Sequence, residues 1–289
     1  GFVAVPSALA EECVFVAPPE GVYQAFGDWH VAENWNTGHV PTENDHVIIP
    51  PGSWCIIQPE DDDHPNIGIA ICHHYTIAKG GKLTNLQNTL VVGSETEVTR
   101  SVVDGVLEGR EPHGYPPSAK LIMRGVGSVG GTGIIDCSRA NGPDYHLSFR
   151  CCGQGLGPCT YKSELLTFED GLTLRGHIRF NGVCLKMDAT AIVDHPDDVM
   201  ELMPSGGGMI CGGLCDQPET VTGHGRFIVS DGLLQVGSAH FVRCGRPRFD
   251  LRGNGRIEVS EDAACMMRVT APVVAGILTN PCQTTACKK

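Results

Sequence analysis

Three stretches of the sequence carry side chains of the kinds that bind metal ions. Four consecutive carboxylates at Glu60, Asp61, Asp62 and Asp63 offer hard oxygen ligands of the type that calcium prefers. Cys72-His73-His74 and the pair Cys211 and Cys215 offer the sulfur and nitrogen atoms that suit zinc. We expect disulfide bonds rather than zinc at these cysteines. For the acidic stretch an exposed loop is the simpler interpretation, so no cofactor is expected and a weak calcium site is the alternative.

A second candidate set is charged and lies in short β-type runs of the C-terminal half. Because side chains alternate between the two faces of a strand, such residues can form an outward row on successive strands. Rows of this kind line saccharide-binding grooves, whereas a solvated face is the plainer alternative, which we favour. The residues are Arg179, Asp250, Arg252, Arg256 and Glu258.

The elements that would position these residues are short and β-rich. Runs of about four residues recur from Val47 onward, each bounded by Gly, Pro, Asn or Asp, and no 3.6-residue periodicity is present. Gly176-His-Ile-Arg-Phe and Gly255-Arg-Ile-Glu-Val alternate apolar and polar residues, which stacked coils can bury as one continuous core. The pattern predicts an all-β fold, a right-handed parallel β-helix, with a β-sandwich or jelly roll as the alternative.

Residues 124–163 interrupt this pattern, because glycines at 125, 127, 130, 131 and 133 lead into closely spaced cysteines. We predict a disulfide-rich loop excursion at 137–159. Fourteen cysteines indicate disulfide bonds and an oxidising compartment. Because Ala8-Leu9-Ala10 also resembles a signal-peptidase site, we expect a secreted protein. Residues 1–10 are then either mature sequence or the remnant of a signal peptide. The structural cysteines are Cys13, Cys55, Cys72, Cys137, Cys151, Cys152, Cys159, Cys184, Cys211, Cys215, Cys244, Cys265, Cys282 and Cys287.

The charge is uneven along the chain. Of 33 acidic residues, 11 precede Lys79, and no Lys or Arg does. An acidic N-terminal quarter repels phosphates, which argues against nucleic acid as a partner. No apolar run approaches the ~20 residues of a membrane span, so none is expected.

Residues 34–50 contain Asn34-Trp35, Gly38, Pro41, Asp45 and Val47-Ile48-Ile49-Pro50. This resembles the lead-in Asn-Trp-x-x-Gly-x-x-Pro-x-x-x-Asp-x-Val-x-Ile-Pro of secreted and cell-surface right-handed β-helix proteins, and residues 28–135 are partly similar to a G8 domain. The resemblance implies an N-terminal cap, with Trp29, Trp35 and Asp45 as cap residues. It implies architecture rather than activity.

Asp197-Asp198, Gly223-His224-Gly225 and Arg256-Ile257-Glu258 occur in that order. They resemble elements of polygalacturonase-type β-helix glycosidases. The resemblance implies an acid/base pair at Asp197 and Asp198, with His224 tuning it and Arg256 binding a uronate carboxylate. Because Glu258 replaces the expected lysine and the Asn-Thr-Asp element is missing, we favour no catalytic residue.

We therefore predict an N-terminal extension and cap at 1–46, a β-helix domain at 47–281 and a disulfide-clamped tail at 282–289. The predicted function is that of a structural or adhesive building block of an extracellular or cell-surface assembly, and we lean against an enzyme. Its partners would be copies of itself or other extracellular structural proteins. The alternatives are a polysaccharide-active hydrolase or lyase and a non-catalytic carbohydrate-binding module, which would bind polysaccharide.

Overall fold

The computed structural model describes residues 11–16, 26–59, 68–110, 119–142, 144–150, 163–181, 185–203, 220–222, 224–236, 240–241, 248–259 and 278–279. They form β-strands and two 3-10 helices, η1 (Ala32–Asn34) and η2 (Arg139–Asn141). No helix in the described residues is long and apolar enough to cross a membrane. The prediction of an all-β protein is confirmed.

The strands form three rows, and every pairing between named strands is parallel. Row 1 contains β1 (Glu12–Val14), β3 (His46–Ile49), β6 (His74–Ile77), β9 (Thr99–Val103), the second half of β11 (Ala119–Gly130), β14 (Ser163–Phe168), β17 (Leu185–Met187), β20 (Thr220–Thr222) and β23 (His240–Phe241). Row 2 contains β2 (Phe26–Asp28), β4 (Trp54–Ile57), β7 (Lys82–Leu86), β10 (Val106–Arg110), β12 (Ile134–Cys137), β15 (Thr173–Gly176), β18 (Thr190–Val193), β21 (Arg226–Val229) and β24 (Arg248–Leu251). Row 3 contains β5 (Ala70–Cys72), β8 (Thr89–Gly93), the first half of β11, β13 (Leu147–Arg150), β16 (Ile178–Asn181), β19 (Val199–Met203), β22 (Leu233–Val236), β25 (Arg256–Val259) and β26 (Leu278–Thr279).

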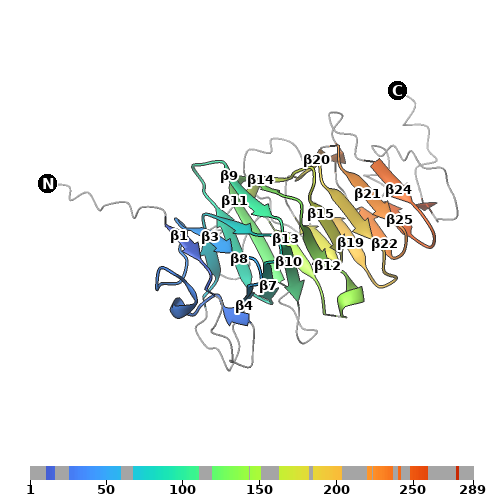
Figure 1. Cartoon of the computed structure of the whole chain (residues 1–289). Helices are drawn as coiled ribbons and strands as arrows, with labels where there is room; N and C mark the ends of the chain where they lie inside the picture. Colours follow the sequence, from blue (N-terminus) through green and yellow to red (C-terminus); the bar gives the residue numbers. More distant parts are fainter. Residues whose placement is uncertain are drawn as a thin grey trace.

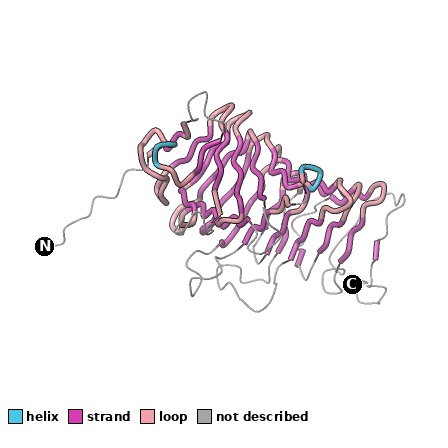
Figure 2. Tube along the Cα trace, turned by 90° about the horizontal axis from the view of Figure 1, so that it is seen from below, coloured by secondary structure: helices cyan, strands magenta, loops and turns pink. Residues whose placement is uncertain are grey.

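From β3 to β25 the chain visits rows 1, 2 and 3 in the same repeating order (Figure 1). Because β11 runs through rows 3 and 1, these two rows form one sheet of 17 strands, and row 2 forms a sheet of nine. Figure 2 shows the strands side by side along the length of the molecule. The antiparallel pairing of a sandwich or jelly roll is not what these strands adopt.

One hydrophobic core runs along the inside of the rows, since alternate strand residues are buried. Within it, Phe149 of β13 stacks on Phe180 of β16 with ring centroids 5.3 Å apart, and Phe168 of β14 meets both rings edge-on. Aromatic side chains bury the largest apolar area per residue, so this cluster anchors the middle of the stack.

Glycines make the turns between rows 1 and 2 stack closely. The carbonyl of Gly81 accepts a hydrogen bond from Val106 N, and that of Gly105 accepts one from Ile134 N, both at 3.0 Å. An alanine Cβ at Gly105 or Gly133 would lie closer than 3.0 Å to the carbonyl oxygen of the glycine one turn before. These positions therefore require glycine for space rather than for an unusual φ.

The prediction that residues 124–163 interrupt the strands is wrong for the described part. The second half of β11, β12 and β13 lie there and pair within the rows, and residues 151–162 lie outside the described residues. The glycines misled the interpretation because they fill places where no side chain fits. At Gly130, for example, a Cβ would meet the Glu169 carboxylate and the Arg100 guanidinium.

The expected disulfide bonds are wrong for Cys13, Cys55, Cys72 and Cys137, which are buried free thiols. Cys55 on β4 and Cys137 on β12 both belong to row 2 but are separated by β7 and β10. Three strand spacings put them ~14 Å apart, whereas a disulfide needs Cα atoms within about 7 Å. The other ten predicted structural cysteines lie outside the described residues.

Candidate functional site

Asp198, half of the suggested acid/base pair, is buried in the turn between β18 and β19. Its Oδ2 accepts a hydrogen bond from Ser138 Oγ at 3.0 Å, and its Oδ1 accepts one from the backbone N–H of Arg139 at 2.7 Å. Burial raises the pKa of this carboxyl, and the two hydrogen bonds oppose that rise. Both oxygens are therefore engaged in holding the start of η2.

The structure does not bring His224 to Asp198. His224 precedes β21 and lies beside Asp188, whose Oδ1 accepts a 2.8 Å hydrogen bond from His224 N. Asp198 lies at the other end of β21, where its carbonyl accepts from Leu233 N. Asp197 and Arg256 are exposed, and Arg256 begins β25 in row 3. The candidate residues of the glycosidase resemblance therefore lie in one region of the stack, but their side chains do not converge on a common site where an acid/base pair could act.

Replacing Asp198 with alanine is expected to lower the free energy of unfolding by about 3 kcal/mol, because the buried Ser138 hydroxyl and the partly buried Arg139 N–H lose a charged acceptor. Asp197→Ala is the matched control, since that neighbouring side chain is 76 % exposed and should change stability by less than about 0.5 kcal/mol. Urea unfolding followed by circular dichroism measures both. Equal effects would contradict the structural role of Asp198.

The charged candidates for binding are divided between two faces. In row 3, Arg179 pairs with buried Glu201 of the next strand at 2.8 Å, and Gln235 and Glu258 continue the same register. In row 2, Asp250 accepts a hydrogen bond from Arg226 and lies 3.6 Å from Arg252. Arg179 and Asp250 are thus paired with neighbouring strands, and the candidates lie in two rows rather than in one groove.

The predicted cap residues lie at the N-terminal end of the stack. Trp29 and Trp35 are buried with ring centroids 5.1 Å apart, and Trp35 Nε1 donates a 2.7 Å hydrogen bond to Trp29 O. Phe15 packs on Trp35 at 5.4 Å. These rings cover the beginning of the core. The buried carboxylate of Asp45 accepts from Thr42 N and Thr42 Oγ1, both at 2.7 Å, and so holds the turn into β3.

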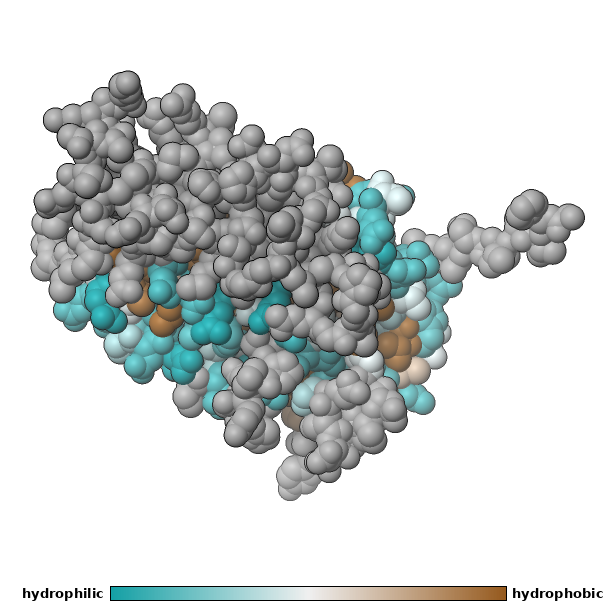
Figure 3. Space-filling model, turned by 180° about the vertical axis from the view of Figure 1, so that it is seen from behind, coloured by the Kyte–Doolittle hydropathy of each residue, from teal (hydrophilic) through white to brown (hydrophobic). Residues whose placement is uncertain are grey.

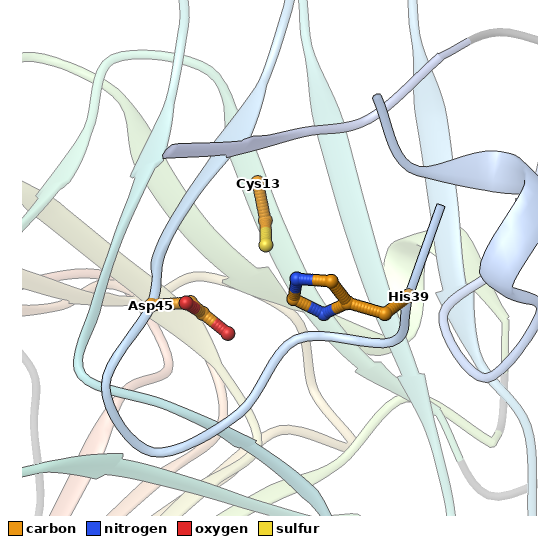
Figure 4. A group of neighbouring side chains, drawn as sticks. All are labelled: Cys13, His39 and Asp45. Carbon is orange, nitrogen blue, oxygen red and sulfur yellow. The ribbon is translucent and has the colours of Figure 1, made fainter. Parts of the chain in front are cut away.

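A group that the sequence did not suggest lies beside this cap. Cys13, His39 and Asp45 place one sulfur, nitrogen and oxygen atom within 4.8 Å of one another (Figure 4). The hydrogen bond to Val40 raises the pKa of His39, and burial raises the pKa of the Cys13 thiol. No spacing could have revealed the group, because parallel pairing of β1 with β3 brings together residues about thirty positions apart.

The candidate calcium ligands Glu60, Asp61, Asp62 and Asp63 lie outside the described residues. No protein-family model matches the chain, and neither the curated proteins nor the solved structures contain a match to it.

Proposed function

We propose that this chain is a right-handed parallel β-helix that serves as a structural or adhesive building block of an extracellular assembly. The repeating visit to rows 1, 2 and 3, with parallel pairing throughout, is the pattern that a chain coiling in one direction produces. A right-handed path follows from the near-universal hand of parallel crossovers.

The observation that carries the proposal is that outward charged side chains bond to the neighbouring coil. Glu108 accepts a 2.7 Å hydrogen bond from Thr84 Oγ1 and lies 2.9 Å from Lys82 Nζ. Arg100 of β9 and Glu169, the residue after β14, approach to 2.6 Å across the second half of β11, which lies between those two strands. Such pairs join one coil to the next or to the one after it, which suits a rigid rod more than a catalytic surface, where free acid and base groups are needed.

The surface also suits association through charge. On the face in Figure 3, the visible described residues are mostly hydrophilic, with small hydrophobic groups between them. The N-terminal end carries exposed carboxylates at Glu11, Glu12, Glu33 and Glu43, and the chain has no Lys or Arg before Lys79. Residues 240–289 contain eight Lys and Arg against four Asp and Glu, so the two ends of the sequence carry opposite charge. Opposite charge at the two ends favours head-to-tail contact, which generates filaments when it does not close.

The extracellular setting rests on the number of cysteines and on the resemblance of residues 34–50 to cell-surface β-helix lead-ins. The four buried free thiols contribute nothing to it, because thiols in a dry core are protected from oxidation in any compartment.

Light scattering coupled to negative-stain electron microscopy tests the proposal on the purified full chain. We expect filaments, rings or a stable oligomer, whose formation weakens at high salt because the contact is electrostatic. The double variant Glu12→Lys/Glu33→Lys should reduce assembly at least about tenfold, which corresponds to ~1.4 kcal/mol of contact energy.

The control is Asp170→Lys, which makes one such charge change, half that of the double variant, at an exposed turn in the middle of the stack. It should assemble like the unchanged chain. A monomer at all concentrations would contradict the proposal, and release of soluble fragments from an acidic polysaccharide would favour the enzyme instead.

A further inference from the structure

Three side chains from separate segments converge at the N-terminal end of the stack. Cys13 belongs to β1, His39 follows η1, and Asp45 immediately precedes β3. One donor atom from each lies within 4.8 Å of the other two (Figure 4). Cys13 and Asp45 are buried, whereas the His39 side chain is 43 % exposed, so an ion can reach the group from solvent on the histidine side.

The histidine is oriented for coordination. Its Nδ1 lies 3.1 Å from Val40 O, a carbonyl that can only accept, so Nδ1 donates there and Nε2 is the nitrogen left to coordinate an ion, once it gives up the proton that it shares with Glu11 Oε2 at 3.4 Å. Figure 4 shows the ring nitrogen farther from the side-chain stem turned toward Cys13 and Asp45. A histidine whose other ring nitrogen donates to a backbone carbonyl is the usual arrangement at a metal centre.

The carboxylate is oriented in the same way. Both hydrogen bonds from Thr42 go to Asp45 Oδ2, and the backbone N–H of Glu11 donates to Oδ1 at 3.3 Å. These bonds fix the carboxylate from outside, while Oδ1 keeps lone-pair capacity for a cation. A hydroxyl and two backbone amides thus act as an outer shell around the group.

We propose that Cys13, His39 and Asp45 bind a divalent transition-metal ion of the zinc class. A thiolate, an imidazole and a carboxylate are the ligands that zinc takes, whereas calcium and magnesium require oxygen ligands throughout. Coordination forms a metal–sulfur bond at Cys13 Sγ, and the thiol proton leaves to solvent. The three donors must close by about 1 Å to reach the separations of a tetrahedral site with bonds of about 2.0–2.3 Å.

Glu11 supplies the fourth ligand in this proposal. Its Oε2 lies 3.4 Å from His39 Nε2, and its exposed side chain is free to turn toward the ion. The ion would join β1, the segment after η1 that carries His39, and the turn before β3 that Asp45 holds. It would therefore fasten the first strand at the end where the stack begins, in a region whose described cysteines form no disulfide.

Cobalt(II) titration of the full chain tests the site, because a cobalt–thiolate bond gives a charge-transfer absorption in the near ultraviolet. We expect His39→Gln to bind one equivalent fewer than the unchanged chain and to lose that absorption at this site, and Cys13→Ser to do the same. Thr42→Val, which removes only an outer-shell hydroxyl, should weaken binding about tenfold.

His224→Gln and Cys137→Ser are the matched controls, one exposed histidine and one buried thiol away from the group. Both should keep the full stoichiometry and absorption. His39→Gln is the decisive variant, because its side chain is half exposed and its loss leaves the core intact. If it binds as many equivalents as the unchanged chain with the same absorption, the site does not exist.

Discussion

Replacing Gly105 with alanine is expected to lower the free energy of unfolding by about 3 kcal/mol, the upper part of the range for overpacking. The added Cβ would lie against the carbonyl oxygens of Gly81 and Ala78 and 2.9 Å from Ile77 Cγ2. Backbone atoms cannot rotate away as a flexible side chain can. The Gly81 carbonyl is also fixed by its hydrogen bond to Val106 N.

Gly68→Ala is the matched control for this substitution. Nothing lies within 4 Å of a Cβ at Gly68, and its φ is not in the left-handed region. We expect no loss of stability there, and a gain of up to about 1 kcal/mol from the reduced freedom of the unfolded chain. The urea midpoints of Gly105→Ala and Gly68→Ala measure this difference in stability. Equal midpoints would show that the stacked turns tolerate a side chain at Gly105.

Acidification from pH 6.5 to pH 5 is expected to remove about 3 kcal/mol of stability through His146 and His177, because the loss for each approaches about 1.4 kcal/mol per pH unit once the unfolded imidazole is protonated. Both side chains are buried, with ring centroids 4.6 Å apart. Burial, together with the nearby charges of Arg139 and Arg179, lowers the pKa of His146 to about 2 and that of His177 to about 3.

The direction follows from proton uptake. Below pH 6.5 the unfolded chain protonates both imidazoles, while the folded chain keeps them neutral, so stability falls as the pH falls toward the folded-state values. His177 Nδ1 accepts a 3.2 Å hydrogen bond from Arg139 Nε, which a protonated ring could not do. The loss should therefore be steep between pH 6.5 and pH 5.

The double variant His146→Phe/His177→Gln isolates this contribution, because other histidines titrate equally in both proteins. Its free energy of unfolding at pH 7.5 is expected to be lower than that of the unchanged chain. Toward pH 5, however, its unfolding should take up about two fewer protons, so its stability should decline less steeply as the pH falls. Unfolding curves at a series of pH values give that slope. An identical slope in both proteins would mean that the buried rings are protonated in the folded state.

Local sequence identified many strands closely. Gly176-His-Ile-Arg-Phe contains the first three residues of β16, and Gly255-Arg-Ile-Glu-Val contains the whole of β25. These runs were recognisable because a half-buried strand alternates apolar and polar residues, and turn residues bound it. Strands between glycines, such as β12, escaped notice, because a glycine that permits close backbone contact looks the same in sequence as one that breaks a strand.

The candidate site was less accessible to sequence reasoning. Asp198 has the residue type of a general acid, yet burial against Ser138 and Arg139 turns it into a structural acceptor. Burial and partners depend on residues 59 and 60 positions away, which no local pattern contains. The same is true of the thiol at Cys13, which parallel pairing with β3 places beside Asp45.

The sequence by itself determined the all-β class, the positions of many strands and the acidic character of the N-terminal end, because these follow from local alternation, turn residues and counting. Only the tertiary structure decided that the pairing is parallel, that four cysteines remain thiols and that Cys13, His39 and Asp45 meet. The physical reason is that hydrogen bonding between parallel strands joins residues about twenty to forty positions apart, and side-chain chemistry depends on which neighbours that register supplies.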